Sequence, residues 1–265
     1  MTTPFKYRSK LVQKTILIVG GSSGLGYAAA EASLESSASR VILLSSNLTK
    51  LSSAESRLRE TYTPLLSPFQ IETHQIDLTD LPNLRENLIT ILDAATADGE
   101  YKIDHVIYTA DSSHPLPPFR QTTPGDISAS FALRASAPLL LASLLSSYIH
   151  QTPDSSITFT NGSSSHRPMP GWPVADSAAG AMEGLVRGLA CELAPVRVNL
   201  VSSGPVTTEL FNTLPEEVVE GFRAKCLTGR LGRPEDVAEA YLYLMRDGFV
   251  TGATIFTEGG RILAP

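Results

Sequence analysis

The sequence predicts a doubly wound α/β fold, a parallel sheet of about seven strands with helices on both faces. Short apolar runs rich in Val and Ile recur along the chain and alternate with longer stretches of helical periodicity. This alternation is the pattern of repeated βαβ units. The runs are nearly continuous in hydrophobicity, so most are predicted to be strands buried on both faces. The chain has 265 residues and no visible linker, and we expect one domain covering 1–265.

The predicted strands are TILIV (15–19), RVILLS (40–45), FQIETHQI (69–76), HVIYTA (105–110), SITFT (156–160), VRVNLVS (196–202) and ATIFT (253–257). Helical patterns cover residues 24–37, 48–59, 84–97, 126–149, 176–193 and 234–247. We expect Pro138 to kink the fourth of these helices. Two Ser- and Pro-rich segments, 112–125 and 161–173, follow strands and are placed at the carboxyl edge of the sheet. That edge is where open α/β sheets bind ligands.

Composition narrows the class of partner. The net charge is −6 and no dense basic run occurs, which argues against nucleic acid. No apolar run reaches the length of a membrane span, and the first residues do not resemble a signal peptide. Cys191 and Cys226 are far apart and fit neither a disulfide framework nor a metal site. We therefore expect a cytoplasmic protein that binds small molecules and no metal.

A glycine-rich loop follows the first predicted strand. In VGGSSGLG (19–26), Gly20 permits a tight turn, Gly24 lets the backbone approach a pyrophosphate, and Gly26 lets the next helix pack on the strand. A flexible turn is the simpler interpretation of such a loop alone, but the strand–loop–helix context favours nucleotide binding. The predicted contacts of the loop are Gly20, Ser22, Ser23, Gly24, Leu25 and Gly26.

The end of the second predicted strand favours NADP(H) over NAD. An acidic residue there would accept a ribose 2′-hydroxyl and repel a 2′-phosphate, but this strand ends in Ser45, Ser46 and Asn47. These neutral donors, with Ser22 and Lys50, are the candidate partners of a 2′-phosphate, although a helix cap also explains Ser-Ser-Asn. Asp77 and Leu78, after the third strand, are the candidate adenine contacts.

Several motifs occur in the order found in one family. VGGSSGLG, DLTD (77–80), YTA (108–110), VRVNLVSSGPVTTEL (196–210) and RLGRPEDVAEAYLYLM (230–245) together resemble the short-chain dehydrogenase/reductase family. The resemblance implies a Rossmann-type domain, a homo-oligomer (dimer or tetramer), and NADP(H) lying across the strand ends. It adds Ala110 and Gly204 to the cofactor contacts. The Val206 backbone and the Thr208 side chain would bind the nicotinamide carboxamide.

The same resemblance implies a loss of the family's acid chemistry. Its members use a Ser, a Tyr that gives a proton to the alkoxide, and a Lys four residues after the Tyr, helped by an Asn. Ala175 stands at the Tyr position, Ala179 at the Lys position and Arg134 at the Asn position, while Ser163 is the match for the Ser. No Lys lies between residues 102 and 225, and the nearest tyrosines, Tyr148 and Tyr241, belong to other predicted helices.

Arg134 and the sequence PMPGW (168–172) resemble one branch of the family more closely, the fungal bifunctional reductase and Diels-Alderase proteins of the malbrancheamide and paraherquamide pathways. In those relatives an Asp within P-D-P-G-W works with the Arg, and Met169 takes its position here. Asp111 and Asp176 are candidate replacement carboxylates, although a loop-capping acid and a helix amino-terminal acid are simpler interpretations.

Two other side chains, Trp172 and His166, belong to the Ser- and Pro-rich segment 161–173. Trp172 is a candidate substrate contact, with loop packing as the alternative. His166 is expected to be a surface-loop residue without a catalytic role.

Three functions remain open for such a chain. The first is NADPH-dependent reduction of a cyclic imine or iminium, coupled or not to an intramolecular [4+2] cycloaddition. An iminium needs no proton on hydride addition. The second is a redox-silent cyclase or isomerase that holds NADP structurally, favoured somewhat by the apolar Met169. The third is a non-catalytic nucleotide-binding protein.

Overall fold

The computed structural model describes residues 6–65, 68–111, 117–209 and 211–264. Its centre is a seven-stranded sheet in the order β3-β2-β1-β4-β5-β6-β7, in which every neighbouring pair is parallel. The strands are β1 (Thr15–Val19), β2 (Arg40–Ser45), β3 (Gln70–Gln75), β4 (His105–Tyr108), β5 (Ser156–Gly162), β6 (Arg197–Ser203) and β7 (Thr254–Thr257). The strand order reverses between β1 and β4, which places a switch point in the middle of the sheet.

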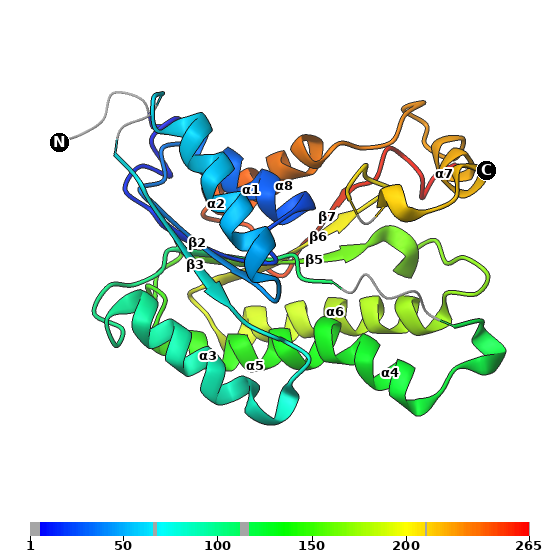
Figure 1. Ribbon diagram of the computed structural model, residues 1–265, viewed down its shortest axis with the longest axis horizontal. Coiled ribbons are helices and arrows are strands. Elements are labelled where there is room, and N and C mark those ends of the chain that lie inside the picture. The colour runs from blue at the N-terminus through cyan, green and yellow to red at the C-terminus, as the bar shows by residue number, and fades with distance from the viewer. Residues whose placement is uncertain (1–5, 66–67, 112–116, 210, 265) are drawn as a thin grey trace.

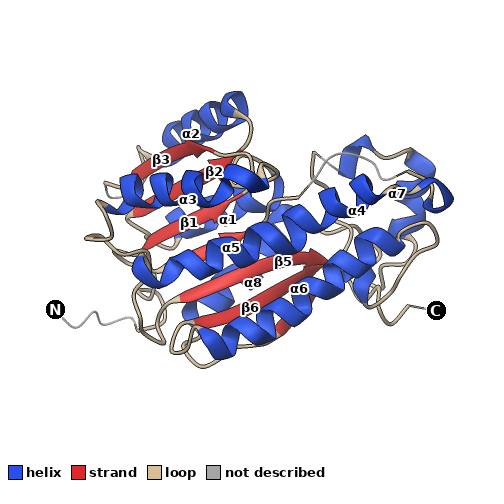
Figure 2. Cartoon of the chain, turned by 90° about the horizontal axis from the view of Figure 1, so that it is seen from below, coloured by secondary structure: helices blue, strands red, loops and turns tan. Residues whose placement is uncertain are grey.

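Helices cover both faces of this sheet (Figure 1). One face carries α1 (Gly24–Glu35), α2 (Leu48–Tyr62) and α8 (Pro234–Arg246). The other carries α3 (Leu81–Thr96), α5 (Ala137–Leu144) and α6 (Pro173–Glu192), which Figure 2 shows in front of the strands. Two short helices, α4 (Pro124–Phe131) and α7 (Glu216–Arg223), lie at the end of the molecule toward which β5 points (Figures 1 and 2). The predicted doubly wound α/β class is confirmed.

All seven predicted strands are present, but two are not buried on both faces. β3 and β7 form the edges of the sheet, and most of their residues are partly or fully exposed. Helices cover the middle of the sheet more completely than its rims, because each crossover helix packs between neighbouring strands. The prediction that most strands are buried on both faces is confirmed by the central strands, and β3 and β7 are the exceptions.

The long predicted helix 126–149 is broken into several pieces. A π-helical stretch, Ala132–Ser136, joins α4 to α5, and a 3₁₀ turn, Leu145–Ser147, follows. Pro138 stands in the first turn of α5, where its missing N–H is tolerated. The helix type changes just before Pro138, and the expected kink at this residue stays a prediction.

By length and hydropathy, Pro124–Ser147 is the one stretch among the described helices that could span a membrane, with a mean hydropathy of 1.4. It packs instead against α3 and α6 as part of the layer below the sheet. A helix that packs against a buried core also has many apolar residues, so its composition alone passes the same test as that of a membrane-spanning helix.

Helix α7 has no counterpart among the helices predicted from the sequence. Its sequence EEVVEGFR is short and mostly charged, and only Phe222 is buried. A helix of eight residues, about two turns, with one buried side chain produces no clear apolar stripe. That side chain, Phe222, packs beside Phe211 with ring centroids 5.5 Å apart.

Candidate active site

The parallel strands bring their carboxyl ends to one edge, and the glycine-rich loop lies at its centre. Gly20 has a φ of +88° and Gly24 a φ of +53°, a region that side chains with a Cβ avoid. A Cβ on Gly20 would lie 2.8 Å from the backbone N of Ala110 at the end of β4. A Cβ on Gly24 would lie 3.3 Å from Cγ2 of Thr208 after β6. The structure thus brings together three segments that were predicted separately to contact the cofactor: the glycine-rich loop, Ala110 after β4 and Thr208 after β6.

Gly26 packs helix α1 against the loop. A Cβ at this position would lie 2.3 Å from the carbonyl oxygen of Gly20, so only glycine fits. The predicted role of Gly26 in close packing agrees with this contact, although the partner is the loop backbone and not the strand.

The amino end of α1 is free of a competing anion. Its N-cap, Ser23, makes no side-chain hydrogen bond to the helix, and the first turn, which includes Leu25, has no acidic residue. The first N–H groups of a helix without such caps attract a phosphate. The glycine cradle and this helix end together fit the pyrophosphate of a dinucleotide.

The end of β2 lies beside the loop. The hydroxyl of Ser22 donates to Oγ of Ser45 at 2.8 Å, and the backbone of Ser46 accepts from Gln75. Asn47 caps α2, since its Oδ1 accepts from the backbone N of Lys50 at 2.9 Å. No acidic side chain occupies 45–47, which agrees with the expected neutral ribose site.

Lys50 has a partner that the sequence did not indicate. Its ammonium lies 2.7 Å from a carboxylate oxygen of Glu209, and both side chains are about half exposed. Glu209 follows Thr208 on the loop after β6. The ion pair therefore joins the adenosine side of the expected cofactor site to its nicotinamide side.

The remaining cofactor candidates are rigid parts of the same edge. Asp77 accepts from the backbone and hydroxyl of Thr79, and these bonds lower the pKa of its carboxyl. Leu78 is almost wholly buried in the core below the sheet. The backbone at Gly204 passes so close to Glu258 that a Cβ would lie 2.5 Å from its Cα, and Val206 is buried.

The two alanines face the sheet from α6. Ala175 and Ala179 are 9% and 3% exposed. The side-chain amide of Asn161, at the end of β5, donates to the carbonyl oxygen of Ala179 at 3.2 Å, and its Oδ1 is buried without a hydrogen-bond partner. No group that titrates near neutral pH occupies either alanine position.

Neither nearby tyrosine replaces the missing proton donor. Tyr241 lies on α8, across the sheet from α6, and shares a hydrogen bond of 2.8 Å with Thr160. Tyr148 lies just beyond the 3₁₀ turn, not within a helix as predicted, and donates to Asp93. Burial raises the pKa of Tyr241 far above neutrality.

Arg134 and Asp111 form an ion pair at this edge. Nη2 of Arg134 lies 2.7 Å from the carboxylate of Asp111, and Nη1 donates to the Ser130 hydroxyl at 3.2 Å. The Arg134 side chain is 21% exposed and that of Asp111 40%. Of the two candidate carboxylates, Asp111 is therefore the one that the structure places against the arginine.

The backbone next to Arg134 is fixed by a residue that sequence reasoning missed. The buried hydroxyl of Tyr108 donates to the carbonyl of Leu133 at 2.7 Å. The N–H of Ala137 donates to the carbonyl of Ala132, five residues back. In the same register the carbonyl of Leu133 would accept from residue 138, but Pro138 has no N–H. The Tyr108 hydroxyl supplies the missing donor to the Leu133 carbonyl. Burial and the charge of Asp111 raise the pKa of Tyr108, so it positions Arg134 and does not act as an acid.

The loop between β5 and α6 carries the other catalytic candidates. Ser163 is buried, and its hydroxyl accepts from Arg261 at 3.5 Å. Met169 and Trp172 form a turn in which Trp172 N donates to Met169 O at 3.2 Å, and the Trp172 side chain is 40% exposed. In the described part of the chain, neither of these two side chains hydrogen-bonds to Arg134.

Asp176 lies in the first turn of α6, as expected of a helix amino-terminal acid, and its Oδ1 is buried without a hydrogen-bond partner in the described structure. His166 is exposed as expected, but it has a carboxylate partner that the sequence did not indicate. Its Nε2 lies 3.0 Å from Oε1 of Glu183 on α6.

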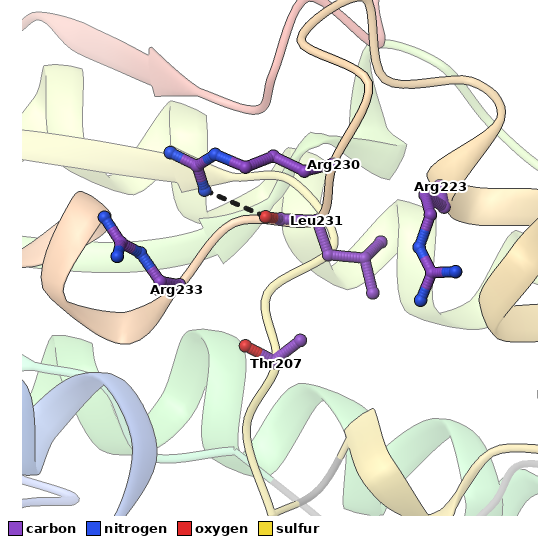
Figure 3. Close-up of a pocket in the computed structure, with 5 residues that line it drawn as sticks. All are labelled: Thr207, Arg223, Arg230, Leu231 and Arg233. Atoms are coloured by element: carbon purple, nitrogen blue, oxygen red, sulfur yellow. Dashed lines mark hydrogen bonds between the residues drawn. The ribbon is translucent and has the colours of Figure 1, made fainter.

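An arginine-lined hollow adjoins this edge (Figure 3). Arg223, Arg230 and Arg233 surround it with Leu231 and Thr207, the neighbour of Thr208. Arg230 and Arg233 both pair with Asp236, at 2.6 and 3.1 Å, and Arg223 pairs with Glu220. Because each of these guanidinium groups already has a carboxylate partner, with Asp236 shared by two of them, we interpret the hollow as a structural ion-pair network.

Comparison with known proteins places the whole chain in one family. Residues 7–264 match the model of an SDR-like Rossmann domain. The short-chain dehydrogenase/reductase malC of Malbranchea aurantiaca is 40% identical over 97% of this chain and 97% of its own length. The short-chain dehydrogenase/reductase fsr5 of Gibberella fujikuroi is 33% identical over 98% of each chain. The solved MalC Reductase/Diels-Alderase from Malbranchea aurantiaca superposes with a TM-score of 0.89, at 39% identity, covering 97% of this chain and 99% of that one.

Proposed function

The chain belongs to the short-chain dehydrogenase/reductase family, and from this premise we propose that it is an NADPH-dependent reductase of cyclic imines or iminium ions in secondary metabolism. The substrate class that we propose is an indole alkaloid or diketopiperazine-like iminium, with reduction coupled to an intramolecular [4+2] cycloaddition in the same pocket. The observation that carries this proposal is the Arg134–Asp111 ion pair beside an α6 that presents Ala175 and Ala179 to the sheet.

The missing acid selects the type of bond that is reduced. A positioned general acid contributes roughly 10² to 10⁴ in rate, and carbonyl reduction requires one because it forms an alkoxide. Reduction of an iminium carbon forms a neutral amine and requires no proton. The bound cofactor would supply the hydride. Burial of Ala175 and Ala179 keeps that region apolar and excludes water.

The ion pair supplies what an iminium substrate needs from the protein. The Asp111 carboxylate is partly exposed and holds the Arg134 guanidinium in place. Arg134 stays protonated at working pH, so it donates hydrogen bonds but is a poor acid. Held by Asp111 and Ser130, its guanidinium would bind a lactam or diketopiperazine carbonyl and orient the ring. Trp172 would stack on the aromatic or cationic part of the substrate.

The preference for NADP(H) is part of the proposal. Ser22, Ser45 and Ser46 lie together without a carboxylate, and Lys50 would turn from Glu209 to the 2′-phosphate. A phosphate accepts charge-assisted hydrogen bonds more strongly than a single carboxylate does. The backbone around Val206 and the Thr208 side chain would hold the carboxamide.

A redox-silent cyclase is the second candidate, and Met169 favours it. An apolar side chain stands where the relatives of this branch are expected to carry an acid. A cycloaddition requires no acid, and holding diene and dienophile close together can supply several kcal/mol. In that case NADP would serve as part of the pocket wall and would not be consumed.

The discriminating experiment is incubation with NADPH and a prenylated indole-diketopiperazine iminium, followed by mass spectrometry of the products and absorbance at the NADPH band. Reduced product with loss of NADPH supports the reductase. Cyclised product with NADPH intact supports the cyclase. If neither product forms but NADPH binds in a thermal-shift assay, the result supports the third function, a non-catalytic nucleotide-binding protein. Unchanged activity in Arg134→Ala would overturn both enzyme proposals.

We also propose that the protein is a cytoplasmic homo-oligomer that pairs through α6. Gly180, Gly184 and Gly188 are exposed at four-residue spacing, and a Cβ at each would meet nothing within 4 Å. Such a row of small residues permits close approach of a helix from a second copy. Light scattering tests this, and Gly184→Glu is expected to shift the mass toward the monomer.

A further inference from the structure

The loop that carries Met169 and Trp172 is tied to the end of the chain. This loop, residues 163–172, connects β5 to α6, and residues 258–264 follow β7; we refer to them as the β5–α6 loop and the C-terminal segment. The two are about 90 residues apart in sequence and lie at the same end of the molecule. Their contacts are made mainly by one arginine from each.

The two arginines bond reciprocally. Nη1 of Arg167 donates to the carbonyl oxygen of Arg261 at 2.5 Å and also to the carbonyl oxygen of Ala264. In the opposite direction, Nη2 of Arg261 donates to the carbonyl of Arg167 at 3.2 Å, and Nη1 donates to Oγ of Ser163 at 3.5 Å. Each side chain therefore holds the backbone of the other segment.

Burial makes this arrangement costly to disturb. Arg261 is 2% exposed, and its guanidinium lies 5.8 Å from the centre of the Phe222 ring. A buried guanidinium that loses its hydrogen-bond acceptors pays a large desolvation penalty. Arg261 donates to Ser163 Oγ and to the Arg167 carbonyl, which both belong to the β5–α6 loop. Opening that loop would therefore remove these acceptors from the buried guanidinium.

A third contact ties the same loop to the sheet and to α6. The His166 ring meets the Phe256 ring of β7 edge-on, with centroids 4.8 Å apart, and its Nε2 faces Glu183. These contacts involve the first half of the loop. The second half is a short turn in which Gly171 has a φ of +88° and Trp172 N bonds to Met169 O. The turn directly follows the clamped part of the loop, so we expect its position to depend on the clamp.

We propose that Arg167 and Arg261 are positioning residues that lock the β5–α6 loop onto the C-terminal segment and so fix Met169 and Trp172 at the substrate side of the sheet edge. Neither arginine needs to touch the substrate. The locking is independent of the reaction, whereas its effect on substrate binding rests on the proposed function.

Trp172 provides a direct readout because it is the only tryptophan in the chain. The variants are Arg167→Gln, Arg261→Met and the double variant, with Arg167→Lys as the conservative replacement and Arg187→Gln, an exposed position on α6, as the matched control. Acrylamide quenching of Trp172 emission is measured with NADPH present, after circular dichroism has shown that each variant is folded.

We expect the quenching constant of Trp172 to rise about twofold or more in Arg167→Gln and in Arg261→Met, as a released loop opens locally. The double variant should match the singles, because both remove one reciprocal clamp. Arg167→Lys should lie between, since an ammonium cannot bridge two carbonyls as a guanidinium does. Arg187→Gln should equal the wild type.

Quenching equal to the wild type in folded Arg167→Gln would overturn the proposal, even if Arg261→Met failed to fold. Additive effects in the double variant would also contradict it. With the iminium substrate, a lost clamp should raise KM about tenfold and change kcat less, because ground-state positioning is lost. A quenching change without any catalytic activity in the wild type would support the clamp and reject the proposed function, so the two can be separated.

Discussion

The two halves of the sheet edge differ in what holds them together. The half around β1, β2 and β3 is built by backbone contacts, with Gly20 and Gly26 so tightly packed that a Cβ would collide at each. The half around β4, β5 and α6 is built by side chains, among them the Arg134–Asp111 pair and the arginine clamp. The first half has a glycine cradle and a helix amino end that fit a dinucleotide, whereas α6 in the second half has Ala175 and Ala179 at the two positions where the family resemblance leads us to expect a tyrosine and a lysine. The features that fit cofactor binding and the positions expected to deliver a proton therefore belong to different halves.

The largest expected effect lies in the second half. Arg134→Leu should lower kcat/KM for the iminium by about 10² to 10³, because the donor to the substrate carbonyl is lost. NADPH affinity should stay unchanged, which separates the two halves. Arg134→Lys should recover only part of the rate. Steady-state kinetics and NADPH titration measure both, with the exposed Arg85→Leu as the control; a parallel loss of NADPH binding would contradict the separation.

The second largest effect is expected from a substitution in the glycine-rich loop, in the half of the sheet edge around β1, β2 and β3. In Gly26→Ala the new Cβ would lie 2.3 Å from the carbonyl of Gly20, so the loop must shift. We expect NADPH to bind about 50-fold more weakly, equivalent to about 2 kcal/mol. Isothermal titration with NADPH checks this. Gly125→Ala, where a Cβ would meet only Thr123 Oγ1 at 3.5 Å, is the matched glycine control and should bind normally.

The stability of the whole fold is expected to depend on pH through a buried histidine in the middle of the sheet. His105 on β4 is 1% exposed, and burial, with the charges of Arg197 and Lys14, lowers its pKa to about 3. The pKa of this histidine in the unfolded chain is about 6.5. The folded protein therefore has its full stability above pH 6.5, where His105 is neutral in both states, and its free energy of unfolding falls as the pH drops from 6.5 toward 3. The loss should reach about 2 kcal/mol at pH 5. Urea unfolding at pH 7 and pH 5 measures it.

The comparison variant for this pH effect is His105→Gln, which retains a polar group for Ser156 Oγ, 2.9 Å from His105 Nδ1. Its stability should change less between the two pH values than that of the wild type. An equal loss in both proteins would assign the acid sensitivity to other groups.

The smallest effect tests the link between the halves. Lys50→Ala should weaken NADPH binding about tenfold and leave NADH binding unchanged, as expected for one charge-assisted phosphate contact. Glu209→Gln should strengthen NADPH binding a few-fold, because Lys50 no longer has a competing carboxylate. Fluorescence titration with both cofactors checks the pair. If Lys50→Ala weakened both cofactors equally, Lys50 would not bind the 2′-phosphate.

The part of the fold that repeats could be predicted from sequence. Strand and helix periodicity identified all seven strands, since buried parallel strands produce near-continuous apolar runs. The glycine loop was also readable, because its spacing follows from steric needs of the backbone. The exposed edges β3 and β7 and the short helix α7 were not, since these depend on where helices stop covering the sheet.

The partners of charged side chains were less predictable. Arg134 and Asp111 were both candidates, but nothing in their 23-residue separation indicated that they pair. Lys50 with Glu209, and Arg167 with Arg261, join segments far apart in the chain. Such pairs are set by how loops meet at the sheet edge, and a single sequence contains no periodic signal for them.

The π-helical stretch at Ala132–Ser136 makes the site sensitive to chain length. A π turn holds one residue more than the α turn it replaces. Deleting a single residue of this stretch before Arg134 is expected to restore an α-helical register and to rotate Arg134 by about 100°, away from Asp111. A one-residue change in length would therefore be enough to separate the ion pair without altering either of its side chains.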